Sequence, residues 1–346
     1  ISLSDIKKVG AIGGKTIAYY LCTTACAIVI GLIIANVFNV GGGYTLTTDE
    51  LSYEAKAAPS FIETIVNIFP SNFVQPMSDA SMLQIIVIAL FFGFGILAAG
   101  KKAQPVADFV NGMSEVCIKI MHMIISIAPF GVFGLITPVV ATNGPDILLP
   151  LLKLILVAYL AMILHMVLVY SGMVKAIAKM GPLTFFKGQF RAMTFAFASA
   201  SSVGTLPINM ECSEKLGVRR EISSFVLPLG ATINMDGTAI YQGVCAIFIA
   251  QVFGIDLTLG QQCVIVMTAV LSSIGTAGVP GSGMIMLAMV LQSVGLPVEG
   301  IALVAGVDRV LDMMRTVVNI TGDQSAAVCV DSLEKRKEAR QAAKAA

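Results

Sequence analysis

Long apolar stretches, separated by short polar or basic segments, dominate the pattern along this chain. Four stretches carry no charged residue and are long enough to cross a membrane: residues 16–48, 80–100, 120–145 and 154–174. A helix needs about 20 apolar residues to span the hydrocarbon core of a bilayer. The pattern therefore predicts four membrane-spanning helices.

Basic residues gather at alternate ends of these predicted helices, in a way that gives the helices a direction. Cytoplasmic segments of membrane proteins carry an excess of Lys and Arg. This rule places the basic ends inside the cell and the acidic loops outside. The basic positions are Lys7, Lys8, Lys15, Lys101, Lys102, Lys175, Lys179, Lys187 and Arg191, and the acidic ones are Asp49, Glu50, Glu54 and Asp146.

Beyond Arg191 the apolar segments are interrupted. Residues 195–210 contain Ser, Gly and Pro and both begin and end beside basic residues, which predicts a re-entrant hairpin. Residues 222–255 are interrupted at 234–238, and the uncharged residues 257–298 are too long for one span and contain a Gly-rich break at 275–283. Charge leaves open whether this last segment crosses twice or dips and returns. The Gly-rich tip favours the dip, because exposed backbone at membrane depth must line a cavity or be buried in protein.

Two of these breaks resemble each other. Residues 201–207 read Ser-Ser-Val-Gly-Thr-Leu-Pro, and residues 272–280 read Ser-Ser-Ile-Gly-Thr-Ala-Gly-Val-Pro. The charge pattern gives the two segments opposite orientations. Inverted repeats with broken helices at matching places point to a transport site near the middle of the membrane. The alternative is that these small residues only let helices pack closely.

The last apolar segment, residues 301–330, carries a polar stripe. Six residues share one helical face: Asp308, Asp312, Arg315, Thr316, Asn319 and Asp323. An amphipathic helix on the membrane surface is one interpretation. The other is a stripe that faces a wet cavity, because ionisable residues inside a membrane are usually functional.

The charge of this stripe is not balanced. Together with Asp236 it has four carboxylates and one guanidinium, a formal local charge of −3. Bound cations, or protons on the carboxylates, would balance it. The surrounding candidate ligands, such as Asn234, Thr232 and Thr238, offer oxygen only, which suits Na⁺. The bidentate Arg315 suits a carboxylate that arrives from outside.

Composition agrees with a membrane protein. The 346 residues are 56% hydrophobic and 12% charged, against about 25% charged in soluble domains, and the mean hydropathy is +0.87. A soluble domain, a disordered chain and a nucleic-acid binder are excluded, which leaves a multi-pass protein of the cell (inner or plasma) membrane. The seven cysteines and two histidines favour neither a disulfide framework nor a metal centre. His165 is predicted to be a packing residue.

Three segments resemble the signature segments of a known family. They are residues 234–238 (Asn-Met-Asp-Gly-Thr), 272–283, and 312–323 (Asp-Met-Met-Arg-Thr-Val-Val-Asn-Ile-Thr-Gly-Asp). The family is that of the dicarboxylate/amino acid:cation symporters, the glutamate transporter family, and the motifs are most similar to those of its sodium-coupled archaeal and bacterial aspartate and glutamate transporters. The resemblance implies an all-α polytopic membrane protein, an inverted-repeat elevator transporter with eight transmembrane helices and two re-entrant hairpins. It also implies a homotrimer in membrane lipid, with no enzymatic activity and no organic cofactor.

The resemblance also implies a division of the chain. The first residue is Ile, and we expect the first two transmembrane helices of the family to be absent from this chain. Residues 1–115 would hold the scaffold and trimerisation part, together with the third helix, which starts the transport domain, and the fourth-helix region. Residues 116–180 would form two further transmembrane helices. Residues 181–330 would form the transport core (hairpin 1, helix 7, hairpin 2 and helix 8), and residues 331–346 a cytoplasmic tail.

For the substrate, the resemblance implies L-aspartate or L-glutamate. Arg315 would bind the side-chain carboxylate beside Thr238, and Asp312 would bind the ammonium with help from Thr316. Asn319 and the region of Ser202 would hold the α-carboxylate, under an extracellular gate at residues 278–283. The full set implied is Ser201, Ser202, Thr238, Gly278, Val279, Gly283, Asp312, Arg315, Thr316 and Asn319. Val203, Ala200 and Met314 depart from the family pattern, which affects the expected substrate preference.

For Na⁺, the resemblance implies about three sites. The first would use Asn234, Asn319, Asp323 and the Gly230 carbonyl. The second would use carbonyls of Thr232, Ser273, Ile274 and Thr276, and the third Tyr20, Thr23, Thr24, Asn234 and Asp236.

The expected function is therefore sodium-coupled symport of aspartate or glutamate into the cell. An anionic side chain would satisfy Arg315, and an amine would satisfy Asp312. The alternatives are sodium- or proton-coupled uptake of C4-dicarboxylates or small neutral amino acids, and a passive ion channel. A remote alternative is an intramembrane aspartyl protease with Asp236 and Asp323 as its dyad.

Overall fold

The computed structural model describes residues 6–43, 69–78, 82–126, 148–273 and 281–345, and the single residues 130, 133, 134, 137, 141 and 278. All regular structure within these residues is helical, and they contain no strand. This agrees with the all-α prediction. The predicted acidic loop residues Asp49, Glu50, Glu54 and Asp146 lie outside the described residues.

The described helices are numbered in chain order. Their bounds are α1 Ile6–Val37, α3 Gln75–Ser78, α4 Met82–Ala99, α5 Gln104–Ser126, α7 Leu148–His165, α8 Ser171–Met173, α9 Pro182–Ser199, α10 Ser202–Lys215, α11 Arg220–Ile233, α12 Asp236–Val252, α13 Leu259–Ser273, α14 Ser282–Ser293, α15 Ile301–Ala305 and α16 Asp308–Ala345. Two π-helical turns, Met166–Tyr170 and Val174–Ala178, extend α7 and α8 into one rod.

Two described segments are long and apolar enough to cross a membrane: Ile12–Val37 and Leu148–Ala178. They coincide with the first and fourth predicted spans. The first helix ends at Val37, earlier than the predicted 48, because residues 38–43 form turns. The third predicted span, 120–145, lies largely outside the described residues, and α5, which runs into it, already begins at Gln104.

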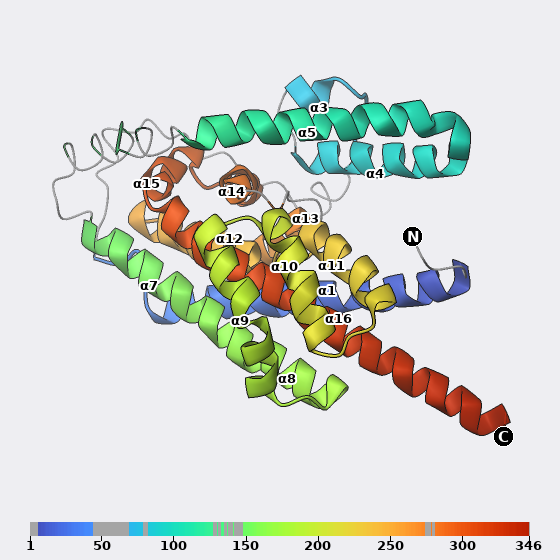
Figure 1. Cartoon of the computed structure of the whole chain (residues 1–346). Helices are drawn as coiled ribbons and strands as arrows, with labels where there is room; N and C mark the ends of the chain where they lie inside the picture. The colour runs from blue at the N-terminus through green and yellow to red at the C-terminus, as the bar shows by residue number, and fades with distance from the viewer. Residues whose placement is uncertain are drawn as a thin grey trace.

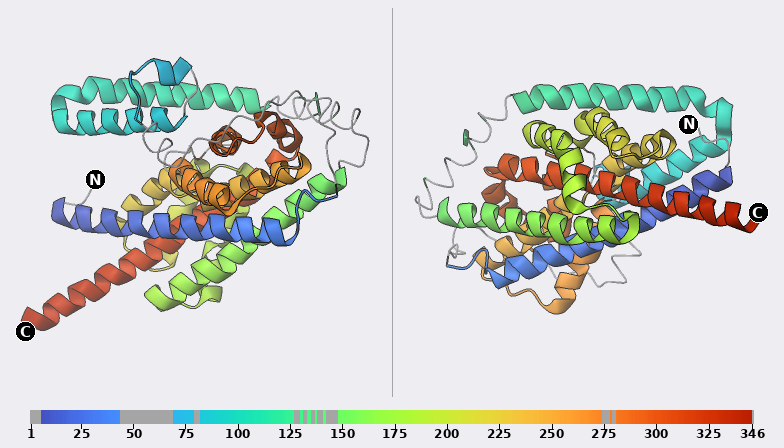
Figure 2. Two further views of the ribbon diagram at one scale, coloured as in Figure 1. Left: turned by 180° about the vertical axis from the view of Figure 1, so that it is seen from behind. Right: turned by 60° about the horizontal axis from the view of Figure 1, so that its bottom comes forward.

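Helix α12 lies at the centre of the packed helices and contacts α1, α7, α13, α14 and α16. Almost all of its side chains are buried, as expected for a helix that is apolar on every side. Figures 1 and 2 show α1 and α16 crossing the body beside it. A Cβ atom on Gly31 of α1 would lie 3.1 Å from the backbone oxygen of Ile240, so small residues allow this close packing.

The predicted breaks are present. Helix α9 ends at Ala200, which has a left-handed φ of 51°, and α10 begins directly after it and packs back against α9. The Ser201 hydroxyl accepts a hydrogen bond from the Gly204 amide at 3.0 Å and caps α10. Helices α11 and α12 are separated at Asn234 and Met235, and α13 and α14 pack as a second pair.

Helices α4 and α5 form a separate layer over the other helices (Figure 1). They are joined by a tight 3₁₀ turn, Gly100–Ala103. At the opposite side, α16 continues beyond residue 330 to Ala345 and projects from the body. The predicted tail is therefore a continuation of the last helix.

Candidate functional site

The interrupted helix α11–α12 brings polar side chains into the interior. Asn234 and Met235 lie between the two helices in non-helical conformations. The side chains of Asn234 and Asp236 are fully buried. Such a break is stable at membrane depth only where other groups satisfy the polar atoms, and helix α16 supplies several of them.

Arg315 on α16 is the largest buried charged side chain of this region, with 1% of its surface exposed. Its Nη1 donates to Asp308 Oδ1 at 2.9 Å, and its Nη2 lies 2.8 Å from Asp312 Oδ1. The guanidinium carbon stands 4.0 Å from the centre of the Tyr241 ring, a cation–π arrangement. Arg315 is thus held by two carboxylates and one aromatic face.

Two glycines let backbone approach Arg315. A Cβ atom on Gly283, at the start of α14, would lie 2.6 Å from Arg315 Nη1, and one on Gly237 would lie 2.4 Å from the Arg315 carbonyl oxygen. The Gly281 amide donates to Asp312 Oδ2 at 3.2 Å. The second hairpin therefore closes directly over the charged stripe.

The two repeated motifs meet at their tips. The Ser201 hydroxyl and the Val203 amide both donate to the Gly278 carbonyl, at 3.3 and 3.2 Å. A Cβ atom on Gly278 would lie 3.0 Å from the Ser202 Cβ, so this contact requires glycine. The structure thus brings Ser201, Ser202 and Gly278 together, while Val279 lies outside the described residues.

Asn319 on α16 is hydrogen-bonded to the start of α12. Its Oδ1 accepts a hydrogen bond from the Gly237 amide at 2.8 Å, and its Nδ2 lies 3.5 Å from Thr238 Oγ1. Thr316, one turn earlier, donates to the carbonyl of Asp312. The residues predicted from the α16 stripe and from α12 therefore form one cluster.

Asp236 is bound by side chains from two other helices. Thr24 of α1 donates to Oδ1 at 2.6 Å, and the Tyr170 hydroxyl donates to Oδ2 at 2.8 Å. His165 Nε2 lies 3.2 Å from the same Oδ2. Thr23 and Tyr20, predicted in the same set, bond instead to the carbonyls of Tyr20 and Val226.

His165 and Tyr170 were missed by the sequence reasoning, and the packing role predicted for His165 omitted its polar contact. Both residues are fully buried. The available signal was their presence five residues apart on an otherwise apolar helix, since polar side chains inside a membrane usually have a partner or a function.

Asp323 is hydrogen-bonded to Asn234. Asn234 Nδ2 donates to Asp323 Oδ1 at 3.0 Å, and a Cβ atom on Gly230 would lie 2.4 Å from that same oxygen. The Asn234 Oδ1 atom is buried and has no hydrogen-bond partner among the described residues. Asn234, Asp323 and the backbone at Gly230 are thus close together.

The remaining predicted cation ligands are only partly described. Thr232 is exposed and donates to the Leu229 carbonyl, and Ser273 is buried and donates to the Val270 carbonyl. Ile274 and Thr276 lie outside the described residues. The described residues therefore do not show these four positions as one assembled cation site.

The charges of the cluster are unevenly paired. Asp308 and Asp312 share Arg315, whereas neither Asp236 nor Asp323 forms an ion pair with Lys or Arg within the described part of the chain. The same part contains no group of three His, Cys, Asp or Glu residues suited to a metal ion. The arrangement leaves two carboxylates in an oxygen-rich interior.

We expect Gly237→Ala to destabilise the protein. The added methyl group would meet the Arg315 backbone at 2.4 Å, and overpacking of this kind costs about 1 to 3 kcal/mol. Thermal unfolding in detergent should show a lower melting temperature. Gly172→Ala is the matched control, because nothing lies within 4 Å of its added Cβ atom; equal melting temperatures for the two variants would contradict the prediction.

Comparison with known proteins gives long matches. The model of the sodium:dicarboxylate symporter family matches residues 1–333. A proton/sodium-glutamate symport protein of Bacillus caldotenax is 40% identical over 96% of this chain and 81% of its own length. The proton/glutamate-aspartate symporter of Escherichia coli is 36% identical (98% and 80%), and C4-dicarboxylate transport protein 1 of Ralstonia nicotianae is also 36% identical (96% and 79%).

Proposed function

Because this chain belongs to the sodium:dicarboxylate symporter family, we propose that it imports aspartate or glutamate together with Na⁺. The family is one of membrane transporters, so the chain is not an enzyme, and the protease reading is abandoned. The observation that carries the choice of substrate is Arg315, buried between Asp308 and Asp312. The second hairpin lies against this ion-paired group at Gly281 and Gly283.

An acidic amino acid satisfies both kinds of group in this cluster. Its side-chain carboxylate would take a bidentate place on the Arg315 guanidinium, which presents its donors in a planar fork. Its ammonium would then bind to Asp312, with Thr316 and Thr238 beside it. A neutral amino acid would leave the guanidinium without a carboxylate from the substrate.

The α-carboxylate would lie at the tip of the first hairpin. Helix α10 begins at Ser202, and the dipole at a helix N-terminus favours an anion. Asn319 would complete this site from α16. Contact between this tip and Gly278 supports a role for the second hairpin, residues 278–283, as the gate.

Asp236 and Asp323 are proposed to receive the cations. Neither has a Lys or Arg partner among the described residues, and their neighbours offer hydroxyl, amide and carbonyl oxygens, the ligands that hard cations prefer. One Na⁺ would use Asn234, Asn319, Asp323 and the Gly230 carbonyl. A second would use Asp236 with Thr24, Thr23, Tyr20 and Asn234, and a third the carbonyls of Thr232, Ser273, Ile274 and Thr276.

The movement proposed is that of an elevator. Residues 181–330 would carry the substrate across the membrane as one body together with α1, whose Thr24 contacts Asp236. Residues 82–126, which form the separate layer of α4 and α5, would belong to the scaffold of a homotrimer. Residues 116–180 would include the two further spans, and residues 331–346 would face the cytoplasm.

Uptake of C4-dicarboxylates is the second candidate, because relatives of 34% to 36% identity are named as C4-dicarboxylate transport proteins. Asp312 argues against this candidate. A substrate without an amine could not pair with the Asp312 carboxylate, which would then repel the carboxylates of the substrate.

Uptake into proteoliposomes separates these possibilities. We expect labelled aspartate or glutamate to accumulate under an inward Na⁺ gradient, and labelled succinate and serine to accumulate much less. Liposomes without protein, and an equal gradient of choline chloride, are the controls. Accumulation of succinate but not aspartate would overturn the choice of substrate, and accumulation driven by a proton gradient alone would overturn Na⁺ coupling.

A further inference from the structure

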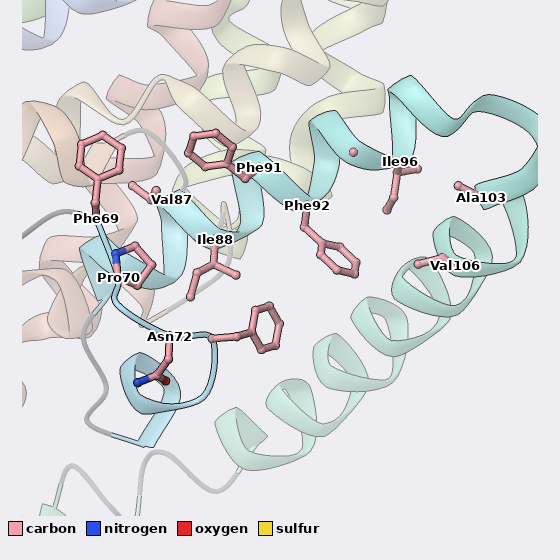
Figure 3. A pocket seen from close by; sticks show the side chains of 12 residues that line it. Phe69, Pro70, Asn72, Val87, Ile88, Phe91, Phe92, Ile96, Ala103 and Val106 are labelled. Carbon is pink, nitrogen blue, oxygen red and sulfur yellow. The ribbon is translucent and has the colours of Figure 1, made fainter.

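Two features of the described chain lie outside the proposed substrate and cation sites. An apolar pocket of about 680 Å³ between α4 and α5 (Figure 3) belongs to the layer proposed as scaffold, where neighbouring subunits would cover it. The other feature is a pair of buried amides in the proposed transport core. Gln189 on α9 is 0% exposed and Asn209 on α10 is 1% exposed.

The two amides join both arms of the first hairpin to α16. Gln189 Nε2 donates to Asn209 Oδ1 at 2.7 Å. Asn209 Nδ2 donates to the backbone carbonyl of Ile320 at 3.1 Å, and Gln189 Nε2 lies 3.4 Å from the same oxygen. One carbonyl of α16 therefore receives side-chain amides from α9 and α10 together.

This carbonyl is the middle one of three contacts that run along one face of α16. Arg309 donates to the Ser199 carbonyl near the hairpin tip, and Asp331 accepts from Arg219 beyond the end of α10. Each lies eleven residues, about three helical turns, from Ile320. Arg309 is exposed and Arg219 is half-buried, so water competes for the outer contacts. The buried middle contact is the one that fixes the register of the hairpin on α16.

Packing alone does not account for amides at these positions. A buried amide costs free energy unless it is hydrogen-bonded, and Gln189 Oε1 is buried with no partner in the described part of the chain. The other residues on this face of α9, such as Phe185, Ala192 and Ala196, are buried and apolar. Apolar contacts are non-directional, whereas a buried polar contact can specify one register.

The register matters because Ile320 directly follows Asn319. Asn319 is proposed to hold the substrate α-carboxylate from α16, and the start of α10 at Ser202 is proposed to hold it from the hairpin. Asn209 lies seven residues after Ser202 on α10, two helical turns away on the same face. A shift of the hairpin along α16 would change the distance between the two halves of this site.

We propose that Gln189 and Asn209 are positioning residues for the substrate α-carboxylate. They fix the register of the first hairpin on α16, and so hold the start of α10 at the distance from Asn319 that this carboxylate requires. Their effect on the substrate passes through the Ile320 carbonyl. This role rests on the proposed function, because it concerns the same α-carboxylate.

Replacing both amides by apolar side chains of similar shape separates a positioning role from a structural one. Removing both partners of a buried hydrogen bond is nearly neutral or stabilising, and the Ile320 carbonyl remains inside the continuous helix α16. Gln189→Met with Asn209→Leu should therefore melt in detergent at or above the wild-type temperature. Calorimetric titration at saturating Na⁺ should show aspartate binding weakened by about 10- to 100-fold.

The α-amide of L-aspartate gives the second readout. It keeps the side-chain carboxylate and the ammonium, and presents a neutral group in place of the α-carboxylate. We expect the same titration to give nearly equal affinities for it in the wild type and the double variant. Ser213→Ala is the matched control, because Ser213 lies buried one turn after Asn209 and its hydroxyl has no hydrogen-bond partner among the described residues. This control should bind aspartate as the wild type does.

Gln189→Met alone keeps the Asn209 bond to Ile320 and should weaken aspartate binding less, so the test does not depend on the double variant alone. Unchanged aspartate affinity in both variants, or an equal loss for aspartate and its α-amide, would overturn the positioning role. A lower melting temperature with unchanged affinity would also overturn it, since the amides would then be structural. A wild type that binds no aspartate would instead overturn the proposed function.

Discussion

Replacing Arg315 by alanine is expected to weaken aspartate binding by roughly 100-fold or more. Removal of one partner from a buried charge pair costs about 2 to 5 kcal/mol in binding, and Arg315 is proposed to pair with the substrate side chain. The Arg315→Ala substitution also leaves Asp308 and Asp312 unpaired, and their charges would repel an anionic substrate. Calorimetric titration of aspartate at saturating Na⁺ measures the effect.

Arg309→Ala is the matched control for this variant. Arg309 lies on the same helix but is exposed, and it donates to the Ser199 carbonyl at 3.4 Å. We expect it to bind aspartate within a few-fold of the wild type. The double variant Asp308→Asn with Arg315→Ala restores the charge balance and controls for folding. If serine and aspartate binding fall equally in Arg315→Ala, Arg315 is structural and the choice of substrate is wrong.

The stripe on α16 could be predicted because ionisable residues stand out inside an apolar segment. The i, i+4, i+7 spacing places Asp308, Asp312 and Arg315 on one face of any α-helix. From the sequence, Arg315 is expected to bind a substrate carboxylate, whereas in the structure it pairs with both aspartates and lies against the Tyr241 ring. Tyr241 could not be assigned from the pattern, since its contact depends on how α12 crosses α16.

The same limit applies to the partners of Asp236, of which only Thr24 was predicted, and that through the family resemblance. Thr24, His165 and Tyr170 come from helices far from Asp236 in sequence, and no local periodicity relates them. Only the packing of α1 and α7 on α12 brings these side chains to one carboxylate. The breaks at Asn234 and Ala200 were more accessible, because polar residues, Gly and Pro inside an apolar segment indicate the interruption directly.

The start of α5 was missed for a different reason. Asp108, Glu115 and Lys119 lie in α5 before residue 120. This part of the helix is therefore not an uncharged stretch. A helix at the membrane boundary can expose such residues to water or headgroups on one side while its apolar side remains in the bilayer. An uncharged run therefore gives the apolar part of a helix and not its full length.

Asp323→Asn is expected to weaken Na⁺ binding and so to raise the Na⁺ concentration that aspartate binding requires. Asp323 has no Lys or Arg partner among the described residues, and its Oδ1 receives a hydrogen bond from Asn234. A unit charge about 4 Å from a cation is worth several kcal/mol inside a protein. The Na⁺ concentration for half-maximal aspartate binding should rise by roughly 100-fold, measured at constant ionic strength with choline chloride.

This result differs in kind from that of Arg315→Ala. Saturating Na⁺ should restore most aspartate affinity to Asp323→Asn, because its substrate contacts are intact, whereas it should not rescue Arg315→Ala. Asp256→Asn, at an exposed loop position between α12 and α13, removes the same formal charge away from the cluster and should leave Na⁺ dependence unchanged. If Asp323→Asn and Asp256→Asn show the same Na⁺ dependence as the wild type, Asp323 is not a cation ligand. If wild-type binding responds to pH and not to Na⁺, both unpaired carboxylates must instead be balanced by protons.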